Sequence, residues 1–324
     1  MDSPAFIQIA AFVIGLLFGS FLNVCISRLP KHESIMRPGS RCPECGTAIR
    51  WYDNIPLLSW ILLRGRCRDC KQSIPWRYPL IELAVSLWFA TVASPIQLYW
   101  DVTRPENAAA LAAVGLHWVP FSAFSREIVL AIGLAILGFL LIGLMVMDWE
   151  TMLLPNAFTV SGIAIGLFLV CIQAIFLGPV EDQVVLNTTH QLRLNSPGSF
   201  ISRGNVFLTG PEALIFGRIV AVCGAAVLLL LVRWLYKAIR HREGMGLGDV
   251  KLIAMIAAFL GFGPAILSLF IGSLAASLYG MFLLVRGKAG ATSKLPFGSF
   301  LCVGGLIAAL YGNRLIDNYI ALLR

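Results

Sequence analysis

Long apolar runs alternate with shorter polar segments along most of this chain. Most of the runs approach the roughly 20 residues that an α-helix needs to cross the hydrocarbon core of a bilayer. The predicted spans cover residues 5–27, 80–98, 127–147, 156–178, 214–235, 250–263, 265–285 and 296–312. The sixth span is short, and Gly261-Phe262-Gly263-Pro264 predicts a tight turn into the seventh. The pattern therefore predicts an all-α polytopic membrane protein with about eight transmembrane helices.

The composition agrees with this fold class. Of the 324 residues, 58% are hydrophobic and 13% are charged, whereas a soluble domain carries about 25% charged residues. A net charge of +8 can indicate nucleic-acid binding. Basic residues gathered on one side of a membrane explain the charge better, so we expect contact with membrane lipid and no nucleic-acid partner. The sequence leaves the oligomeric state open.

The positions of Lys and Arg predict the orientation of the chain. Ten of the 25 basic residues lie in residues 28–79, five in residues 233–251 and three in residues 286–294. All three segments fall on one side of the predicted bundle, which the positive-inside rule assigns to the cytoplasm. Both termini and the loop 179–213 then lie outside, in the periplasm of a Gram-negative host. We therefore expect a multi-pass protein of the bacterial inner membrane.

Four of the eight cysteines form two CxxC pairs separated by 21 residues, Cys42-Pro43-Glu44-Cys45 and Cys67-Arg68-Asp69-Cys70. Four thiolates close a tetrahedron around Zn²⁺, so this spacing predicts a zinc site with Cys42, Cys45, Cys67 and Cys70 as ligands. The zinc would be structural, because a closed Cys₄ site leaves no position for substrate. A pair of disulfides is disfavoured in the reducing cytoplasm, and a thioredoxin-like redox role would need a surrounding βαβ pattern.

Two acidic residues stand at the mouths of predicted membrane helices. Asp148 ends the third span, and Asp249 follows the glycine-rich stretch Gly244-Met245-Gly246-Leu247-Gly248 before the sixth. A carboxylate in such a place costs about 2.5–3.5 kcal/mol on insertion scales, so it normally has a function or a partner. Counting spans from the basic segments puts both acids on the cytoplasmic side.

If the fold brings these two acids together, they can act as a hydrolytic pair. One carboxylate can deprotonate a water while the other protonates or polarises an amide carbonyl. Gly246 and Gly248 would let an extended substrate backbone approach, because they lack side chains. The alternative is that each acid caps a helix N-terminus by itself, which fits Asp249 well and Asp148 poorly. Glu150 competes with Asp148 as the first acid.

An ordered series of motifs runs along nearly the whole chain. In addition to both CxxC pairs, it comprises Gly19-Ser20-Phe21-Leu22-Asn23-Val24 with Arg28-Leu29-Pro30, Asp53-Asn54-Ile55-Pro56-Leu57-Leu58-Ser59-Trp60, Leu63-Arg64-Gly65-Arg66-Cys67, Arg77-Tyr78-Pro79-Leu80-Ile81-Glu82-Leu83, Asp148 with Leu154-Pro155-Asn156, Gly246-Leu247-Gly248-Asp249 with Lys251, and Pro296-Phe297-Gly298. This series resembles the type IV prepilin peptidases, bifunctional leader peptidase/N-methyltransferases of pilus and type II secretion systems.

The resemblance implies that Asp148 and Asp249 are the catalytic aspartates of a GxGD-type membrane aspartic peptidase. Its substrate would be a prepilin or pseudopilin with a short basic leader, cut after a glycine at the cytoplasmic membrane face. The new N-terminal residue would then be methylated with S-adenosylmethionine. Gly65 matches a glycine that the family associates with methylation. Glu150 and Asn156 depart from the family pattern, in which Asp is common at both positions.

We expect three regions on this basis: a first transmembrane helix in residues 1–27, a cytoplasmic zinc module associated with methyl transfer in residues 28–79, and a peptidase core in residues 80–324. Two other functions compete with the bifunctional enzyme. One is a peptidase without methyltransferase activity, because the sequence contains no recognisable S-adenosylmethionine motif. The other is a zinc-bearing membrane transporter whose acids carry ions.

Overall fold

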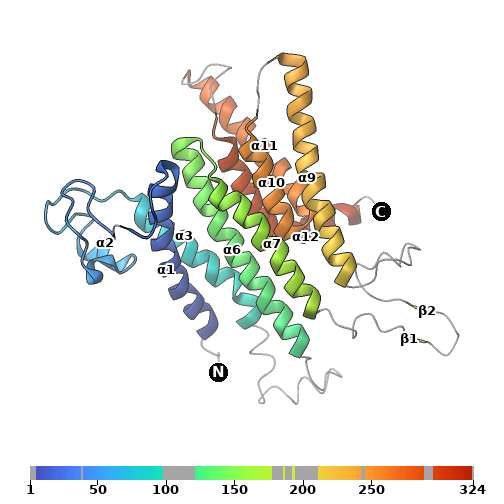
Figure 1. Ribbon diagram of the computed structural model, residues 1–324, viewed down its shortest axis with the longest axis horizontal. Helices are drawn as coiled ribbons and strands as arrows, with labels where there is room; N and C mark the ends of the chain where they lie inside the picture. The colour runs from blue at the N-terminus through green and yellow to red at the C-terminus, as the bar shows by residue number, and fades with distance from the viewer. Residues whose placement is uncertain are drawn as a thin grey trace.

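The computed structural model describes residues 5–37, 39–97, 121–176, 185–186, 192–193, 211–241, 245–287 and 295–322. These residues are mainly helical, which confirms the predicted all-α membrane fold (Figure 1). The exceptions are two strands of two residues each, β1 (Val185–Leu186) and β2 (Leu192–Arg193), which pair antiparallel. Most of the predicted outer loop 179–213 lies outside the described residues.

Every predicted span corresponds to a helix. Seven helices of the described part are long and apolar enough to cross a bilayer: α1 (Phe6–Arg28), α3 (Arg77–Val92), α6 (Phe121–Thr151), α7 (Asn156–Phe176), α9 (Pro211–Arg240), α11 (Phe262–Val285) and α12 (Phe297–Leu322). The eighth, α10 (Leu247–Leu260), has 14 residues and is about 21 Å long at 1.5 Å per residue. The predicted sixth span is therefore shorter than the roughly 20 residues that usually cross a bilayer.

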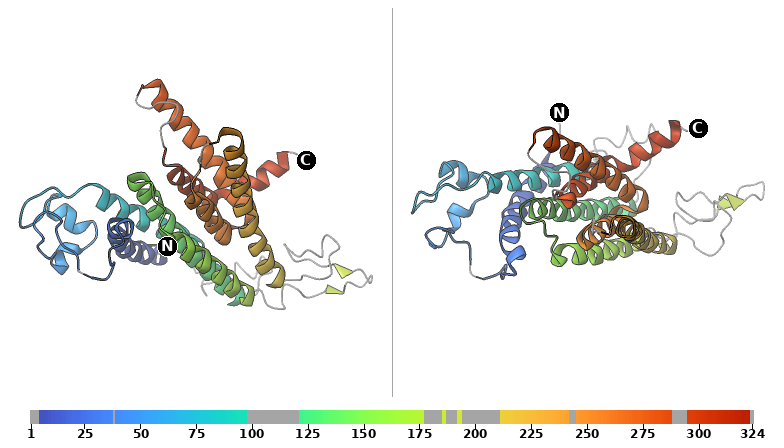
Figure 2. Two further views of the ribbon diagram at one scale, coloured as in Figure 1. Left: turned by 45° about the horizontal axis from the view of Figure 1, so that its top comes forward. Right: turned by 90° about the horizontal axis from the view of Figure 1, so that it is seen from above.

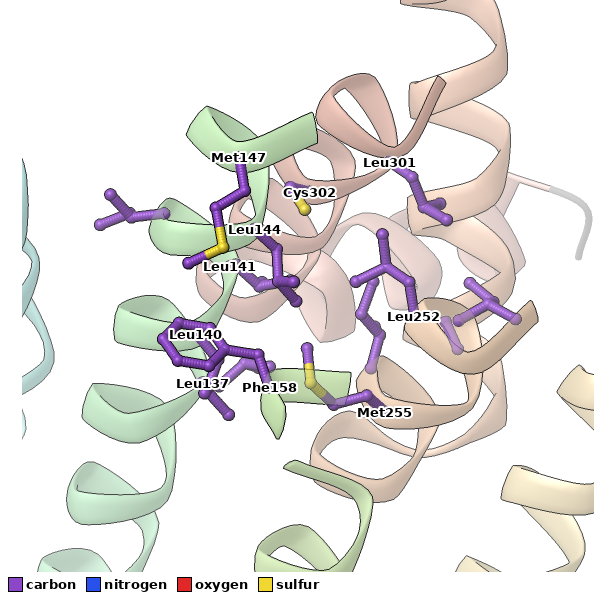
Figure 3. Close-up of a cluster of buried hydrophobic side chains, with 14 of the residues drawn as sticks. Leu137, Leu140, Leu141, Leu144, Met147, Phe158, Leu252, Met255, Leu301 and Cys302 are labelled. Atoms are coloured by element: carbon purple, nitrogen blue, oxygen red, sulfur yellow. The ribbon is translucent and has the colours of Figure 1, made fainter. Parts of the chain in front are cut away.

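The short helix α10 lies inside the bundle, in contact with α6, α7, α9, α11 and α12. Every residue from Leu252 to Ala258 is buried. Figure 3 shows Leu252 and Met255 among apolar side chains of the surrounding helices. A helix that is apolar on all sides is stable where protein covers every face. The core is therefore built around α10, which carries Asp249 in its first turn.

The helices α1 and α3 approach each other closely because α1 carries two glycines at the contact. A Cβ atom at Gly15 would lie 2.5 Å from Cα of Ser86, and one at Gly19 would lie 2.6 Å from Cα of Glu82. Any larger residue would push the two backbones apart. The contact holds the two helices in a fixed register, in which Glu82 is buried against α1.

Residues 29–76 form a small module that stands at one side of the helices in Figures 1 and 2. It contains two 3-10 turns, η1 (Leu29–Lys31) and η2 (Trp51–Asn54), and the short helix α2 (Leu58–Leu62). Arg68 donates from Nε and Nη2 to the two carboxylate oxygens of Asp53, at 2.7 and 2.6 Å. These hydrogen bonds lower the pKa of Asp53, and they hold η2 beside the second CxxC turn.

Candidate active site and metal centre

Asp148 and Asp249 come from helices that meet at one end of the bundle. Asp148 lies in the last turn of α6 and Asp249 in the first turn of α10. Both are buried, with exposed fractions of 5% and 8%, and their carboxyl groups are close enough to interact electrostatically. Lys251 of α10 donates to the side-chain oxygen of Asn156 in α7 at 2.8 Å. The fold thus brings together two acids that are 101 residues apart in the sequence.

Ser299, near the start of α12, holds the carboxyl group of Asp148. Its backbone N–H donates to Oδ2 of Asp148 at 2.6 Å, and its hydroxyl lies 3.0 Å from the same oxygen. The hydroxyl also lies 2.9 Å from the carbonyl oxygen of Met145. Two donors on one oxygen fix the orientation of the carboxyl group. Oδ1 receives no hydrogen bond from any described residue.

Asp249 is oriented by the start of its own helix. Gly246 is the N-cap of α10, with extended backbone angles, and its N–H donates to the Asp249 carboxyl group. Asp249 stands three residues after the N-cap, the position from which an acidic side chain reaches back to the N-cap amide. The helix dipole also favours a negative charge there. Capping therefore accounts for the place of Asp249, whereas Asp148 lies at a helix C-terminus, where the dipole disfavours an acid.

Glu150, the competing acid, has a different environment. Both oxygens of its carboxylate accept from Nη1 of Arg77, at 2.7 and 2.6 Å. The Glu150 side chain is 38% exposed and that of Arg77 is 26% exposed. Glu150 is thus engaged by a cation at the surface, which favours Asp148 over Glu150 as the partner of Asp249.

The glycines around the two acids have different surroundings. A Cβ atom at Gly248 would lie 3.0 Å from Cδ1 of Leu154, so a side chain of this chain occupies that space. A Cβ atom at Gly246 would meet its nearest neighbour, Oδ2 of Asp249, at 3.7 Å. A Cβ atom at Gly298 would lie 3.0 Å from Oδ2 of Asp148. Of the two glycines predicted to admit substrate, Gly246 is the more open.

A groove of about 500 Å³ lies beside the start of α12 and is lined mainly by apolar atoms. Its walls include small residues of α11 and two residues that precede or begin α12: Ser273, Ala276, Ser277, Gly280, Leu295 and Phe297. Phe297 is followed directly by Gly298, where a Cβ atom would lie 3.0 Å from Oδ2 of Asp148. One lining residue of the groove therefore adjoins in sequence the glycine that borders Asp148.

The four CxxC cysteines converge in the module. The sulfur atoms of Cys42, Cys45, Cys67 and Cys70 all lie within 4.8 Å of one another, and those of Cys42 and Cys70 are 3.8 Å apart. Zn–S bonds of about 2.3 Å in a tetrahedron require sulfur atoms about 3.8 Å apart. Hydrogen bonds from Thr47 lower the pKa of the Cys45 thiol to about 6, whereas partial burial and hydrogen bonds with the neighbouring cysteines raise the pKa of the Cys70 thiol to about 12. The match to a metal therefore rests on the spacing of the sulfur atoms. The donor set therefore fits Zn²⁺.

The two CxxC turns share one local structure. The N–H of Gly46 donates to the carbonyl of Cys42 at 2.9 Å, and the N–H of Lys71 donates to that of Cys67 at 3.2 Å. Gly46 has φ of 69° and Lys71 has φ of 60°. The residue after each CxxC pair thus turns the chain back in the left-handed region, where a non-glycine residue is uncommon. In each CxxC pair, this turn places the two cysteine sulfurs on the same side of the chain.

Gly65 shapes the packing of the module. It has φ of 66°, and a Cβ atom there would lie 2.8 Å from Cζ2 of Trp60. The indole N–H of Trp60 donates to the carbonyl of Ile74 at 3.2 Å, and its ring lies 4.2 Å from that of Trp76. A side chain at Gly65 would displace this aromatic pair. A direct contact between Gly65 and S-adenosylmethionine stays a prediction.

Sequence reasoning missed Ser299 and the role of Gly298. The motif Pro296-Phe297-Gly298 directly precedes Ser299. This motif was the sequence signal that could have predicted a functional residue at the start of α12. Cys302, one turn further along α12, is fully buried and lies within electrostatic range of both acids. The start of α12 is therefore a third component of the site, beside α6 and α10.

Two protein-family models match parts of the chain. Residues 13–96 match a family model described as the bacterial peptidase A24 N-terminal domain, and residues 199–281 match one described as the type IV leader peptidase family. The first match contains the four cysteines and the second contains Asp249, while Asp148 lies between them. No solved structure matches the chain significantly.

Three curated relatives carry the name prepilin leader peptidase/N-methyltransferase. The protein from Pseudomonas putida is 31% identical, over 99% of this chain and 96% of its own. That from Aeromonas hydrophila is 30% identical over 95% and 92%, and that from Pseudomonas aeruginosa is 28% identical over 98% and 94%. On this evidence the chain belongs to the type IV leader peptidase family.

Proposed function

We propose that this protein removes the basic leader of type IV prepilins or pseudopilins with Asp148 and Asp249, and then N-methylates the new N-terminus. It is a multi-pass inner-membrane enzyme, a membrane aspartic peptidase and a methyltransferase. The observation that carries the residue assignment is the buried pair of acids at the meeting ends of α6 and α10. The structure gives this pair a supporting residue in Ser299.

In the peptidase reaction, the two acids hold one water between them and share one proton because like charges at short range cannot both persist. The ionised carboxylate takes a proton from the water as its oxygen attacks the scissile carbonyl carbon. The protonated carboxyl group gives its proton to the carbonyl oxygen. The tetrahedral intermediate then collapses, the C–N bond breaks, and the amine leaves with a proton from the dyad. Ser299 keeps one oxygen of Asp148 occupied, which leaves the other for the water.

The groove beside α12 suits the apolar helix of the substrate. Small residues on α11 allow close helix approach, as in other membrane helix pairs. Phe297 lines the groove, and the next residue is the glycine that borders Asp148. A prepilin helix lying there would carry its leader junction to the acids, with Gly246 the open approach. The apolar contact would hold the helix, and the acids would act where it leaves the membrane.

We place the zinc module, residues 28–79, and the two acids on the cytoplasmic side. Ten basic residues in this segment support that side by the positive-inside rule. Cys42, Cys45, Cys67 and Cys70 would hold Zn²⁺, which closes the module as a structural cross-link. S-adenosylmethionine supplies the methyl group when it is bound. Residues 80–324 would form the peptidase core.

The experiment that tests this function uses detergent-purified enzyme and a prepilin, with and without S-adenosylmethionine, and weighs the products. We expect cleavage in both reactions and a gain of one methyl group on the mature chain when S-adenosylmethionine is present. Cleavage without methylation would mean that the protein is a peptidase without methyltransferase activity. An intact prepilin after prolonged incubation would contradict the proposed function.

A further inference from the structure

A polar group of residues, distinct from the aspartate pair of α6 and α10, is buried between α1 and α3. Asn23 of α1 is 3% exposed and Glu82 of α3 is 8% exposed. Ser20 lies one turn before Asn23 on α1, and Tyr78 lies one turn before Glu82 on α3. Gly19 lets the two helices approach at this level. The cluster therefore lies next to the point where Gly19 lets the backbones of α1 and α3 meet.

Glu82 is a buried acid with hydrogen-bond donors and no counterion in the described part of the chain. Its Oε2 accepts from the backbone N–H of Leu57 at 2.8 Å, and its carboxyl group accepts from the hydroxyl of Ser20. No Lys or Arg among the described residues forms an ion pair with it. A carboxylate at a membrane helix interface is costly unless a cation neutralises it, and it marks a functional site by default.

Asn23 leaves an acceptor free on the facing helix, one turn after Gly19, which packs against Glu82. Its amide Nδ2 donates to the carbonyl oxygen of Tyr78 at 3.1 Å. Its Oδ1 is buried and has no hydrogen-bond partner. A buried polar atom without a partner is uncommon in folded proteins and costs about 1–3 kcal/mol. The cluster thus contains a buried carboxyl group without a cation and an acceptor without a donor.

The loop that covers the cluster is strained. Leu57 has φ of 57° and ψ of −50°, and the N–H of Leu58 donates to the carbonyl of Pro56 at 2.6 Å. This is a γ-turn of the rare, strained kind. Its conformation aims the Leu57 N–H at Glu82. Strained backbone of this type gathers at ligand sites, where the surrounding structure maintains it. Here it connects the zinc module directly to the acid.

We propose that Glu82 and Asn23 bind the α-ammonium group of the cleaved substrate for methyl transfer. An ammonium group carries one positive charge and three N–H donors. The ammonium group would supply the cation that Glu82 lacks and the hydrogen-bond donor that Oδ1 of Asn23 lacks. The assignment rests on the proposed function, because the ammonium group exists after the leader has been removed. It adds the binding site for the second substrate.

Methylation requires a neutral amine, and Glu82 would act as the base that removes the proton. Its carboxylate takes one proton from the ammonium group, and the nitrogen lone pair then attacks the methyl carbon of S-adenosylmethionine. The carbon–sulfur bond breaks, its electrons go to sulfur, and a neutral thioether leaves. The product is a secondary ammonium ion, and Glu82 returns its proton to water. One methyl group is gained and one proton is released overall.

The cluster lies beside the peptidase site. Arg77, five residues before Glu82, pairs with Glu150, two residues after Asp148. On the α1 side, a Cβ atom at Gly143 of α6 would lie 2.8 Å from Cδ1 of Leu22. The new N-terminus would therefore move from the end of α6 to the α1–α3 pair, which packs against α6.

Glu82→Gln tests the inference, because it keeps the shape of the side chain and removes its charge. Ser86→Ala is the matched control, since Ser86 is buried one turn further along α3 and bonds to its own helix at Leu83. Asn23→Leu is the second variant, which removes the free acceptor at similar volume. Leader cleavage, measured on the same samples, reports whether each variant folds.

Two measurements separate the possible outcomes. We expect Glu82→Gln to cleave prepilin within about threefold of the wild-type rate and to methylate at least about 100-fold more slowly, as for loss of a general base. Without S-adenosylmethionine, wild type and Ser86→Ala should bind a mature N-terminal peptide with a free amine more tightly than its N-acetylated form, and Glu82→Gln should lose this preference. Asn23→Leu should weaken it.

Methylation of Glu82→Gln at the wild-type rate would overturn the inference, and so would an unchanged preference for the free amine. If Ser86→Ala lost methylation to the same degree, the effect would be structural and the inference would fail. Failure of the wild type to cleave or methylate would instead contradict the proposed function, which the reaction of wild-type enzyme with prepilin detects separately.

Discussion

Asp148→Asn and Glu150→Gln form a matched pair of substitutions that separates the two acids at the end of α6. Both remove a negative charge and keep the side-chain volume. An Asn at position 148 still offers an oxygen to the N–H and hydroxyl of Ser299, so the helix contact with α12 is retained. The two variants therefore differ in chemistry more than in fold.

The expected losses of cleavage rate in the two variants differ by at least an order of magnitude. Removing a general acid or base costs about 10²–10⁴ in rate, which is about 2.7–5.4 kcal/mol at 1.36 kcal/mol per factor of ten. Glu150 is in a partly exposed ion pair with Arg77, and pairs of this kind contribute about 0.2–1 kcal/mol. Its loss should change the cleavage rate by less than about fivefold.

The assay is single-turnover cleavage of a purified prepilin by detergent-purified enzyme, followed by gel shift and mass. Asp317→Asn, an exposed acid near the other end of α12, serves as the control for the loss of one surface charge. All variants should be recovered in the membrane fraction at the wild-type level. Cleavage by Asp148→Asn at more than a tenth of the wild-type rate would refute the acid pair, and so would loss of cleavage in Glu150→Gln alone.

Three further predictions concern the support of the site, the metal and the groove. Ser299→Ala keeps the N–H on Asp148 and loses the hydroxyl, so kcat should fall about tenfold, as for one hydrogen bond to a charged group, with KM unchanged; an unchanged kcat would contradict the positioning role. Cys42→Ser should lower the zinc content measured by metal analysis and make residues 28–79 sensitive to protease, whereas full zinc content would exclude this cysteine as a ligand. Gly280→Leu should slow cleavage of a membrane-embedded prepilin and spare a short leader peptide without the apolar helix, because it fills the groove; equal effects on both substrates would contradict docking there.

The sequence predicted two features of the site that depend on the order of the segments, namely the shared end of the two aspartates and the cysteine cluster. Counting spans from the basic segments put Asp148 and Asp249 at the same end of the bundle, since each span reverses the side of the chain. The spacing of the CxxC pairs predicted a Cys₄ cluster, because two turns with the same local geometry converge in few ways. Both inferences follow from the order of segments along the chain, and neither depends on how side chains pack.

The parts that depend on packing were not predictable. Ser299 is 151 residues from Asp148, and the contact follows from the way α12 packs against α6. Glu150 competed with Asp148 because they are neighbours in sequence, and the ion pair with Arg77 from α3 is what separates them. Gly248 was expected to face substrate, but Leu154 occupies the space beside it. Each of these facts requires the relative positions of two segments that are far apart in the sequence.

The position of α12 after the other helices of the bundle has a consequence for biosynthesis. A ribosome that has just added Asp249 must still add 50 residues, the last of which is Ser299. Until then the first aspartate has neither of the donors that hold its Oδ2. With Asp148 acting as proposed, hydrolytic competence is therefore acquired only after α12 has been made. Nascent chains that carry both aspartates but lack α12 would be inert and would spare neighbouring helices from stray proteolysis.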